Sequence, residues 1–284
     1  MLSTILYPPL ILVLLLPQFL SSPTPPSFPS SYPNPGNTCH LNSLLQSLRI
    51  LNLKTSEPLT TSLHSTSRND KLDSNLELLN ALDLDWKVQY DVPEVLTLLI
   101  SNQLLDPTPL LIPVTDVILP LDGKTTKKEK HSKVPILSLP LKRNFLKSLK
   151  AYETLETIRA QWKNSEGILT DIKKGTLLPS LPPILITSLN RFSLNPSTYE
   201  IEKKSTKCPI VESLNSGHIL TSLICHKGDS TDRGHYISYV KIKNRWFECN
   251  DDLIREVKWK EVKRVGGKEG YVFFGGGRRM GSYD

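Results

Sequence analysis

The chain has 284 residues, of which 38% are hydrophobic and 22% are charged, and its formal net charge is +7 at pH 7. This length fits one large domain or two small ones, and the composition predicts a packed globular core. The four cysteines are too few for a disulfide framework and form no C-x-x-C pair, which argues against a zinc knuckle and favours a reducing compartment. They are Cys39, Cys208, Cys225 and Cys249. No metal or other cofactor is expected.

Much of the basic excess lies in three runs, at 124–133, 258–268 and 278–279. Such runs can contact an anionic membrane or a nucleic acid. Solvated loops are the favoured interpretation, because no aromatic interleaving and no nucleic-acid motif accompanies the runs. We therefore expect no nucleic-acid partner.

The first residues combine an apolar run with prolines. Residues 5–20 carry no charge, but the uninterrupted apolar core Leu10–Leu16 is shorter than the roughly 20 residues of a membrane span. Three interpretations of the segment 1–20 stay open: a membrane anchor, a cleaved signal and a soluble N-terminus. A secretory signal has a basic start, whereas no Lys or Arg precedes Arg49. The segment 21–33 is rich in proline and serine and is predicted to be a linker without a stable fold.

A polar loop that contains glycine runs directly into Cys39. Leucines at three- and four-residue spacing follow it and predict a helix with one buried face. Asn37 or Thr38 would be its N-cap. In the first turn, backbone N–H groups and the helix dipole would lower the thiol pKa of Cys39 and favour a nucleophile. A buried structural cysteine is the alternative, and a histidine with an orienting partner would decide between them. The leucines are Leu41, Leu44, Leu45, Leu48 and Leu51.

A second helix is expected near residues 92–104. Asp91 fits its N-cap and Glu94 follows three residues later, as in a capping box. The alternative to a functional role is that these two acids only cap and stabilise the start of the helix. The remaining segments of this half are predicted as a loop or short helix at 52–75, an extended hairpin or exposed insertion at 106–133, a short strand at 134–141 and a helix at 145–163.

From about residue 180 the pattern becomes that of β-strands, rich in β-branched and aromatic residues and bounded by Gly, Asn or Asp. Lys243 and Asn244 fit a tight hairpin turn. Helices that precede an antiparallel sheet predict an α+β fold. The strand candidates are 184–194, 219–226, 235–243, 245–249 and 270–274.

His235 opens one strand of the predicted hairpin, and Asn250 and Asp251 end the next. Either side chain could accept the imidazole N–H and fix the tautomer, so that the other ring nitrogen faces a thiol as a base. Gly234 leaves room for a backbone that approaches from the other side. The side chain of Asn34 and the N–H of the cysteine are placed to donate to an oxyanion.

Four segments, in the same order along the chain, resemble the sequence boxes of the ubiquitin-specific proteases, a papain-like family of cysteine deubiquitinases. The motifs are N-x-G-N-T-C-[YF]-x-N-S-x-L-Q at 34–48, Q-Q-D-x-x-E-[FL]-L at 89–96 and L-P-x-x-L-x-[LI]-x-L-x-R-F at 181–192. The histidine box H-x-G-x-x-x-x-G-H-Y-x-x-Y, with its following W-[YF]-x-[FC]-[ND]-D, is matched at 224–251 and continues at 271–274.

The resemblance implies a papain-like α+β fold with a helical thumb, an antiparallel-sheet palm and fingers. It implies that Cys39 is the nucleophile, that His235 is the general base and that Asn250 is the third catalytic member. The adjacent Asp251 contributes in some relatives, and Asn34 matches the oxyanion-hole position.

The resemblance also implies the partners, which are ubiquitin and ubiquitinated proteins. Asp91 and Glu94 match acids that contact the arginines of the ubiquitin tail. The two glycines of the tail would thread a channel over Gly234 and His235, and Tyr236 is assigned to the same binding site.

Several positions depart from the family motifs. His40 replaces the usual Tyr or Phe, Pro35 stiffens the loop before Gly36, and Tyr90 stands where a second Gln is common. Arg233 stands where a second glycine often precedes G-H-Y. The paired C-x-x-C of the fingers is absent, so that no zinc is expected and the fingers are expected to be reduced.

From the resemblance we expect a catalytic domain at 34–276, followed by a flexible tail at 277–284. Because ubiquitin is cytosolic, we expect this domain to face the cytosol, either free in the cytoplasm or anchored to the mitochondrial outer membrane or endoplasmic reticulum. A catalytically weak or inactive ubiquitin-binding scaffold is the alternative function. A secreted papain-like protease fits less well, because such enzymes have another sequence around the cysteine and carry disulfides.

Overall fold

The computed structural model describes residues 26–163, 167–229 and 234–277. The helices are α1 (Cys39–Arg49), α2 (Leu59–His64), α3 (Arg68–Ala81), α4 (Val92–Ser101), α5 (Phe145–Tyr152) and α6 (Trp259–Glu269), with a short 3-10 helix, η1, at Thr108–Leu110. The strands are β1 (Ile112–Pro120), β2 (Lys128–Val134), β3 (Leu137–Leu139), β4 (Glu156–Lys163), β5 (Leu169–Leu177), β6 (Ile184–Leu189), β7 (Phe192–Leu194), β8 (Ile201–Lys203), β9 (His218–Lys227), β10 (His235–Ile242), β11 (Arg245–Asn250), β12 (Leu253–Val257) and β13 (Gly270–Gly277).

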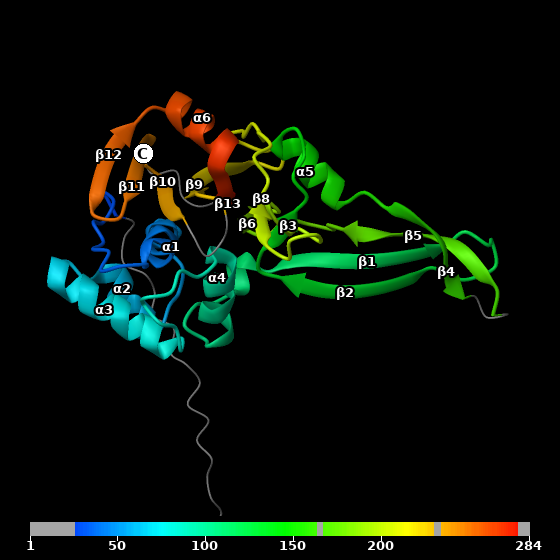
Figure 1. Ribbon diagram of the computed structural model, residues 1–284, viewed down its shortest axis with the longest axis horizontal. Coiled ribbons are helices and arrows are strands. Elements are labelled where there is room, and N and C mark those ends of the chain that lie inside the picture. The colour runs from blue at the N-terminus through cyan, green and yellow to red at the C-terminus, as the bar shows by residue number, and fades with distance from the viewer. Residues whose placement is uncertain (1–25, 164–166, 230–233, 278–284) are drawn as a thin grey trace, which may run out of the picture.

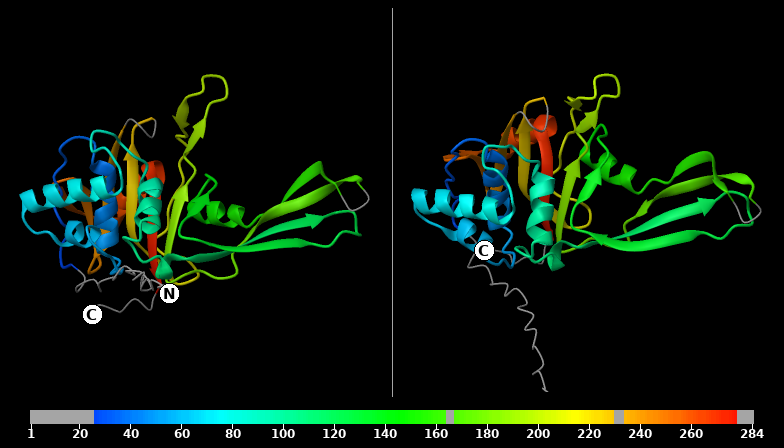
Figure 2. Two further views of the ribbon diagram at one scale, coloured as in Figure 1. Left: turned by 90° about the horizontal axis from the view of Figure 1, so that it is seen from below. Right: turned by 60° about the horizontal axis from the view of Figure 1, so that its bottom comes forward.

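The strands form two main sheets. A seven-stranded sheet, here called the palm sheet, has the order β12-β11-β10-β9-β13-β6-β3, and a four-stranded sheet, here called the arm, has the order β2-β1-β5-β4. The arm extends away from the body (Figure 1). The two-stranded hairpin β7–β8 projects separately, as Figure 2 shows.

The palm sheet carries a hydrophobic core on each face. Along β9, Ile224 packs in the core that contains the helix α1, whereas its neighbours Leu223 and Cys225 pack in the core that contains Val262 of α6. This alternation is the two-residue period of a strand that is buried on both sides. It places α1 and α6 on opposite faces of the sheet (Figure 1).

Helix α1 confirms the predicted leucine face. The leucines are at most 2% exposed, and each buried leucine stabilises a fold by about 1.5–3 kcal/mol relative to an exposed one. The helix contacts β9, β10 and β11, so burial fixes its N-terminal residue Cys39 beside the start of β10. Four of these leucines, Leu41, Leu44, Leu45 and Leu48, lie on α1, and the fifth, Leu51, follows its end.

The strand predictions of the second half are confirmed for the palm sheet. Lys243 and Asn244 both have positive φ angles, 47° and 62°, as the tight turn between β10 and β11 requires. The candidate 184–194 is divided into β6 and β7. Between them lies Arg191, which is fully buried and donates from Nε to the backbone oxygen of Gly270 at 2.6 Å.

The prediction of one helix over 145–163 is wrong in its second half. Helix α5 ends at Tyr152, and β4 then pairs antiparallel with β5, with Ile158 opposite Ile172. Ile172 is 5% exposed. The residues of β4 show no clear helical or strand periodicity in the sequence, so burial against β5 decides that they form a strand. The expected extended hairpin at 106–133 becomes β1 and β2 of the arm. We expected the fingers to be reduced. The arm, which stands where we would look for the fingers, is long (Figure 2).

The segment before Asn34 also differs from the expected linker. Tyr32 is fully buried, and its N–H donates to the backbone oxygen of Asp251 at 3.2 Å. Ser30 pairs with the side chain of Gln46 on α1. This segment is therefore packed on α1 and on the residue that follows β11. The first 25 residues, including the apolar segment, and residues 278–284 lie outside the described residues.

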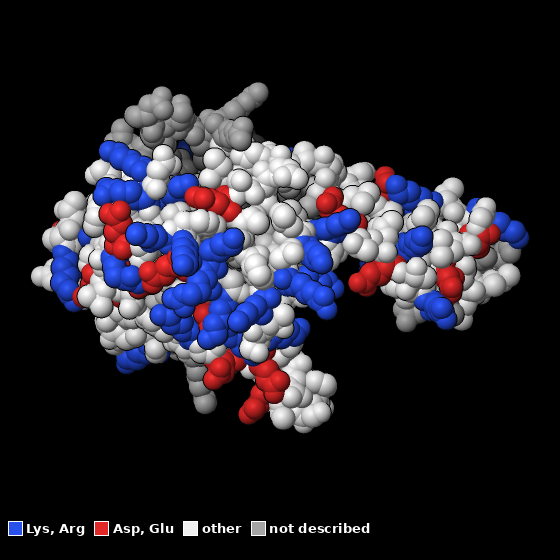
Figure 3. Space-filling view, turned by 90° about the horizontal axis from the view of Figure 1, so that it is seen from above, with Lys and Arg blue, Asp and Glu red and all other residues white. Residues whose placement is uncertain are grey.

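Two of the basic runs belong to regular elements rather than loops. Run 258–268 forms most of α6, whose Val262 is buried and whose basic side chains are exposed, and Figure 3 shows basic side chains gathered on this face. Part of run 124–133 forms the exposed strand β2. Within the described ranges, no helix has the length and apolar character that crossing a membrane requires.

Candidate active site

Cys39 is the first residue of α1 and is 3% exposed. Burial raises the pKa of its thiol, while the backbone N–H groups of Tyr236, His40 and Cys39 itself lower it and the nearby Asp251 carboxylate raises it further. We expected a lowered pKa. The helix N-terminus acts in that direction, but desolvation is larger, so the net pKa shift is upward.

His235 and Asn250 lie side by side at the ends of β10 and β11. The distance from His235 Nε2 to Asn250 Oδ1 is 2.5 Å, and the nearest oxygen of Asp251 is 4.0 Å from Nε2. Because an amide oxygen only accepts, Nε2 carries the hydrogen and Nδ1 keeps its lone pair. This juxtaposition was predicted from the hairpin. No hydrogen bond joins the Cys39 thiol to the imidazole, although both residues are described.

Asp251 connects the palm to the loop that precedes Cys39. It has a positive φ of 53°, and its carboxylate accepts hydrogen bonds from Asn34 Nδ2 at 2.9 Å and from Asn42 Nδ2 at 2.8 Å. Asn75 of α3 donates to Asn42 Oδ1 at 3.2 Å. Sequence reasoning missed Asn42, although a buried polar side chain on the leucine-rich helix is a signal that could have found it.

Asn34 is held from both ends of its amide. Its Oδ1 accepts from the N–H groups of Gly36 and Thr38, at 3.0 and 3.2 Å, and from the hydroxyl of Thr38 at 3.1 Å. Thr38 therefore stands at the N-cap position without capping α1 through its own side chain. One Nδ2 hydrogen of Asn34 is used by Asp251. An amide nitrogen has two, so a second remains for a ligand.

Asp91 faces two tyrosines instead of capping α4 through its side chain. Its carboxylate accepts from Tyr271 Oη at 2.8 Å and from Tyr236 Oη at 3.3 Å. Burial raises the pKa of Asp91, and the hydrogen bonds from the two hydroxyls lower it. The structure thus brings Asp91 and Tyr236 together, while Glu94 stays exposed on the first turn of α4.

Gly234 is required by its surroundings. Its φ is +157°, and a Cβ atom there would lie 2.4 Å from the backbone oxygen of Lys227 and 2.5 Å from Nε2 of His226. We expected the glycine to make room for an approaching chain. Within the described residues, the neighbouring strand β9 crowds this position, and no side chain fits there.

His226 is a buried neighbour of the site that sequence reasoning did not select. It is 0% exposed, its ring packs against Phe192 and Tyr236, and neither ring nitrogen has a hydrogen-bond partner among the described residues. Burial, the largest cause, and the nearby Lys203 lower the pKa of His226 to about 4. The neutral ring therefore packs against Gly234, directly before β10.

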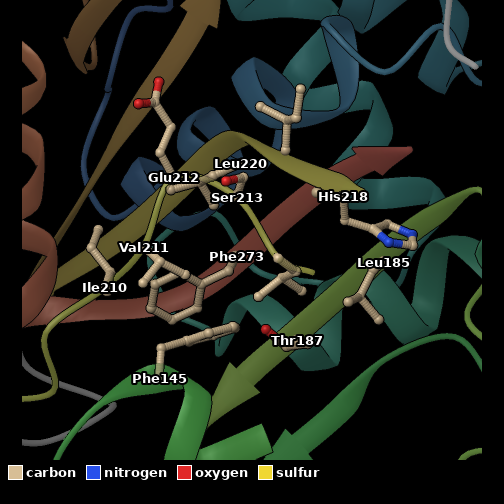
Figure 4. A pocket seen from close by; sticks show the side chains of 13 residues that line it. Phe145, Leu185, Thr187, Ile210, Val211, Glu212, Ser213, His218, Leu220 and Phe273 are labelled. Carbon is tan, nitrogen blue, oxygen red and sulfur yellow. The ribbon is translucent and has the colours of Figure 1, made fainter. Parts of the chain in front are cut away.

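A separate pocket lies among β6, β9, β13 and the loop 210–214 (Figure 4). Phe145, Phe273 and Leu185 make it largely apolar, and the buried hydroxyl of Thr187 has no hydrogen-bond partner there among the described residues. None of the candidate catalytic residues lines it, so the site around Cys39 is distinct from this pocket.

Comparison with known sequences identifies the family. The sequence profile described as ubiquitin carboxyl-terminal hydrolase matches residues 79–274, which is more than half of the chain. The chain belongs to the ubiquitin carboxyl-terminal hydrolase family. His235, Asn250 and Asp251 lie inside the matched range, whereas Asn34 and Cys39 precede it.

Individual members of the ubiquitin carboxyl-terminal hydrolase family are distant relatives of this chain. It is 25% identical to ubiquitin carboxyl-terminal hydrolase 7 of Drosophila melanogaster over 85% of this chain and 26% of that protein. It is 29% identical to Ubl carboxyl-terminal hydrolase 18 of Mus musculus over 52% of this chain and 48% of that protein. The chain thus spans about a quarter of the first relative and about half of the second.

Solved structures of similar fold include a chain of the SAGA Ubp8/Sgf11/Sus1/Sgf73 DUB module bound to ubiquitin aldehyde. The TM-score is 0.71 at 18% identity, over 89% of this chain and 70% of that one. The same module bound to monoubiquitin gives 0.73 at 19% identity, over 93% and 72%. These matches confirm the predicted α+β fold with its helices and sheet palm.

Proposed function

We propose that this chain is a thiol-dependent deubiquitinase that hydrolyses the bond between the C-terminus of ubiquitin and a lysine side chain. The observation that supports the proposal most is the short contact between His235 and Asn250. The backbone N–H of Tyr236, the residue after His235, bonds the sulfur of Cys39. The groups that we propose as nucleophile, base and orienting group come from α1, β10 and β11.

The reaction follows from these positions. His235 Nδ1 takes the proton of the Cys39 thiol, and the sulfur attacks the carbonyl carbon of the terminal glycine. The free Nδ2 hydrogen of Asn34 and the N–H of Cys39 stabilise the oxyanion. When the C–N bond breaks, His235 returns the proton to the lysine amine, and a thioester remains. Water, deprotonated by His235, then hydrolyses the thioester and regenerates the thiol.

The resting thiol is protonated in this proposal, because burial raises its pKa and the imidazole does not yet bind it. The His235 side chain is 37% exposed and can turn about Asn250 as a substrate displaces solvent. Catalytic hydrogen bonds often shorten only when a substrate binds.

Asp91 and Glu94 are proposed to pair with the arginines of the ubiquitin tail. Asp91 is already oriented by Tyr236 and Tyr271, each of which donates to one of its oxygens, and each oxygen keeps a second lone pair for a guanidinium. Gly234 and Tyr236 would form the wall along which the two tail glycines reach Cys39.

The domain limits 34–276 and the placement of this unit in the cytosol are part of the proposal, as is an anchor at 1–20. A fusion of residues 1–33 to a fluorescent protein tests the anchor by imaging and carbonate extraction. A diffuse, extractable signal would contradict it.

The function is tested with ubiquitin that carries a C-terminal aminocoumarin. Wild-type protein is expected to release the fluorophore, and Cys39→Ala and His235→Ala are expected to abolish release while still binding ubiquitin. Binding by the wild type without release would identify the scaffold alternative instead.

A further inference from the structure

His40 follows the nucleophile and is fully buried. Its Nδ1 lies 2.8 Å from the backbone oxygen of Asn37, which can only accept, so Nδ1 carries the hydrogen. The other nitrogen, Nε2, is buried without a hydrogen-bond partner among the described residues. An unpaired buried acceptor destabilises a fold. Among the residues that the structure describes, the bond to Asn37 is therefore the one polar interaction of the His40 side chain that favours a histidine at this position.

The ring of His40 packs edge-to-face against Tyr90, with 5.7 Å between the ring centres. The hydroxyl of Tyr90 accepts from the backbone N–H of Asp85 at 3.0 Å, and the Asp85 carboxylate accepts from the N–H of Lys87 at 2.9 Å. These bonds close residues 85–90 into a compact loop, here called the thumb loop, whose last residue lies on His40.

The thumb loop touches the chain before Cys39 at two further points. Asn37 Nδ2 donates to the backbone oxygen of Lys87. The Trp86 ring lies so close to Gly36 that a Cβ atom there would be 3.2 Å from Cζ3. Asn37 is thus held by His40 on one side and by the thumb loop on the other. It lies between Gly36 and Thr38, whose N–H groups orient Asn34.

We infer that His40 and Tyr90 are a coupled pair of positioning residues that fix the thumb loop on the segment 34–38 and so set the oxyanion donors. The inference rests on the proposed function. Both residues depart from the family motifs at the positions given above, and the structure shows that these two departures contact each other. Neither side chain touches the reacting atoms, and the backbone N–H of His40, which bonds the sulfur of Cys39, is kept in every variant below. Each acts through Asn37 and the loop that it holds.

The substitution His40→Phe separates this role from a role in folding. Phe keeps a ring against Tyr90 and removes the unpaired Nε2, so the melting temperature is expected to stay equal or rise. It also removes the bond to Asn37, so kcat for aminocoumarin release is expected to fall about tenfold, because small displacements of positioned groups slow catalysis. KM is expected to change less than twofold. A fall in both kcat and melting temperature would indicate a folding role and overturn the inference.

The matched control is His64→Phe in α2, because His64 Nε2 is likewise buried without a partner among the described residues. This variant is expected to keep the wild-type kcat. Coupling is measured with Tyr90→Gln, which is also expected to lose about tenfold in kcat. The double variant His40→Phe/Tyr90→Gln is expected to lose little more than either single variant, since each substitution frees the same residue, Asn37, from one of its two supports, His40 or the thumb loop. Multiplied losses would overturn the pairing.

Amide hydrogen exchange makes the inference testable even if wild-type protein releases no aminocoumarin, which would contradict the proposed function alone. In His40→Phe, the segment 34–38 is expected to exchange faster than in wild type and in His64→Phe. Equal exchange in all three proteins would overturn the inference.

Discussion

The Asp251 carboxylate holds the amide of Asn34 at 2.9 Å with one oxygen and the amide of Asn42 at 2.8 Å with the other. It therefore joins the end of β11 to the loop before α1 and to α1 itself. At the same time its charge raises the pKa of the Cys39 thiol. The same carboxylate positions one part of the site and opposes ionisation of another.

Asp251→Ala separates these two effects. Loss of the carboxylate releases Asn34, and loss of an oxyanion donor lowers kcat by about 10²–10³-fold in other enzymes. The alkylation rate of Cys39 by iodoacetamide, followed against pH, is expected to shift to lower pH, because a neighbouring negative charge has been removed. An unchanged kcat, or an alkylation profile shifted to higher pH, would contradict the assigned role.

Asn250→Ala removes the acceptor that fixes the His235 tautomer. We expect kcat to fall by about 10²-fold, in the range of a misplaced general base, with little change in ubiquitin affinity. Steady-state kinetics with ubiquitin–aminocoumarin and a separate binding titration measure the two quantities. Asn250→Asp, which keeps an acceptor oxygen, is the matched control and should retain most of the activity.

Gly234→Ala is expected to destabilise the fold by about 1–3 kcal/mol, because the new Cβ meets the Lys227 backbone and the φ angle disfavours a side chain. Denaturant unfolding measures the change. Gly267→Ala is the control: its Cβ has nothing closer than 3.5 Å, and alanine in a helix is expected to stabilise the fold by about 0.5–1 kcal/mol. Equal effects of the two substitutions would contradict the packing described for Gly234.

Acid should weaken the fold through buried histidines. Burial lowers the pKa of His40 to about 4, from 6.5, so the unfolded chain binds the proton first. The free energy of unfolding is therefore expected to fall as the pH drops from about 6.5 to about 4, by at most about 3 kcal/mol for this residue. Denaturation midpoints across this range test it. His40→Phe should show a smaller loss, and an identical loss would contradict the assignment to His40.

The sequence predicts the elements whose pattern and packing agree. The leucine period of α1, the hairpin turn at Lys243–Asn244 and the strands of the palm sheet needed only local rules. The pairing of His235 with Asn250 followed from their places at the open end of one hairpin, opposite its turn, and the structure brings them together.

Features that depend on distant contacts could not be read from the sequence. The strand β4 replaces a predicted helix because the following strand β5 offers it a pairing partner, with Ile158 opposite Ile172. The thiol pKa of Cys39 is raised because the sheet covers the helix end, which the helix alone does not reveal. The contact between His40 and Tyr90 joins two motifs that lie 50 residues apart, and no local pattern marks it.

The most direct test of the central claim is reaction with ubiquitin that carries a C-terminal electrophile, followed by peptide mapping of the adduct. All four cysteines are buried, so exposure alone does not single out one of them. We predict a single ubiquitin adduct on Cys39, absent from Cys39→Ala and strongly slowed in His235→Ala. A folded wild-type protein that forms no adduct, or that forms it on Cys208, Cys225 or Cys249, would contradict the assignment of Cys39 as the nucleophile.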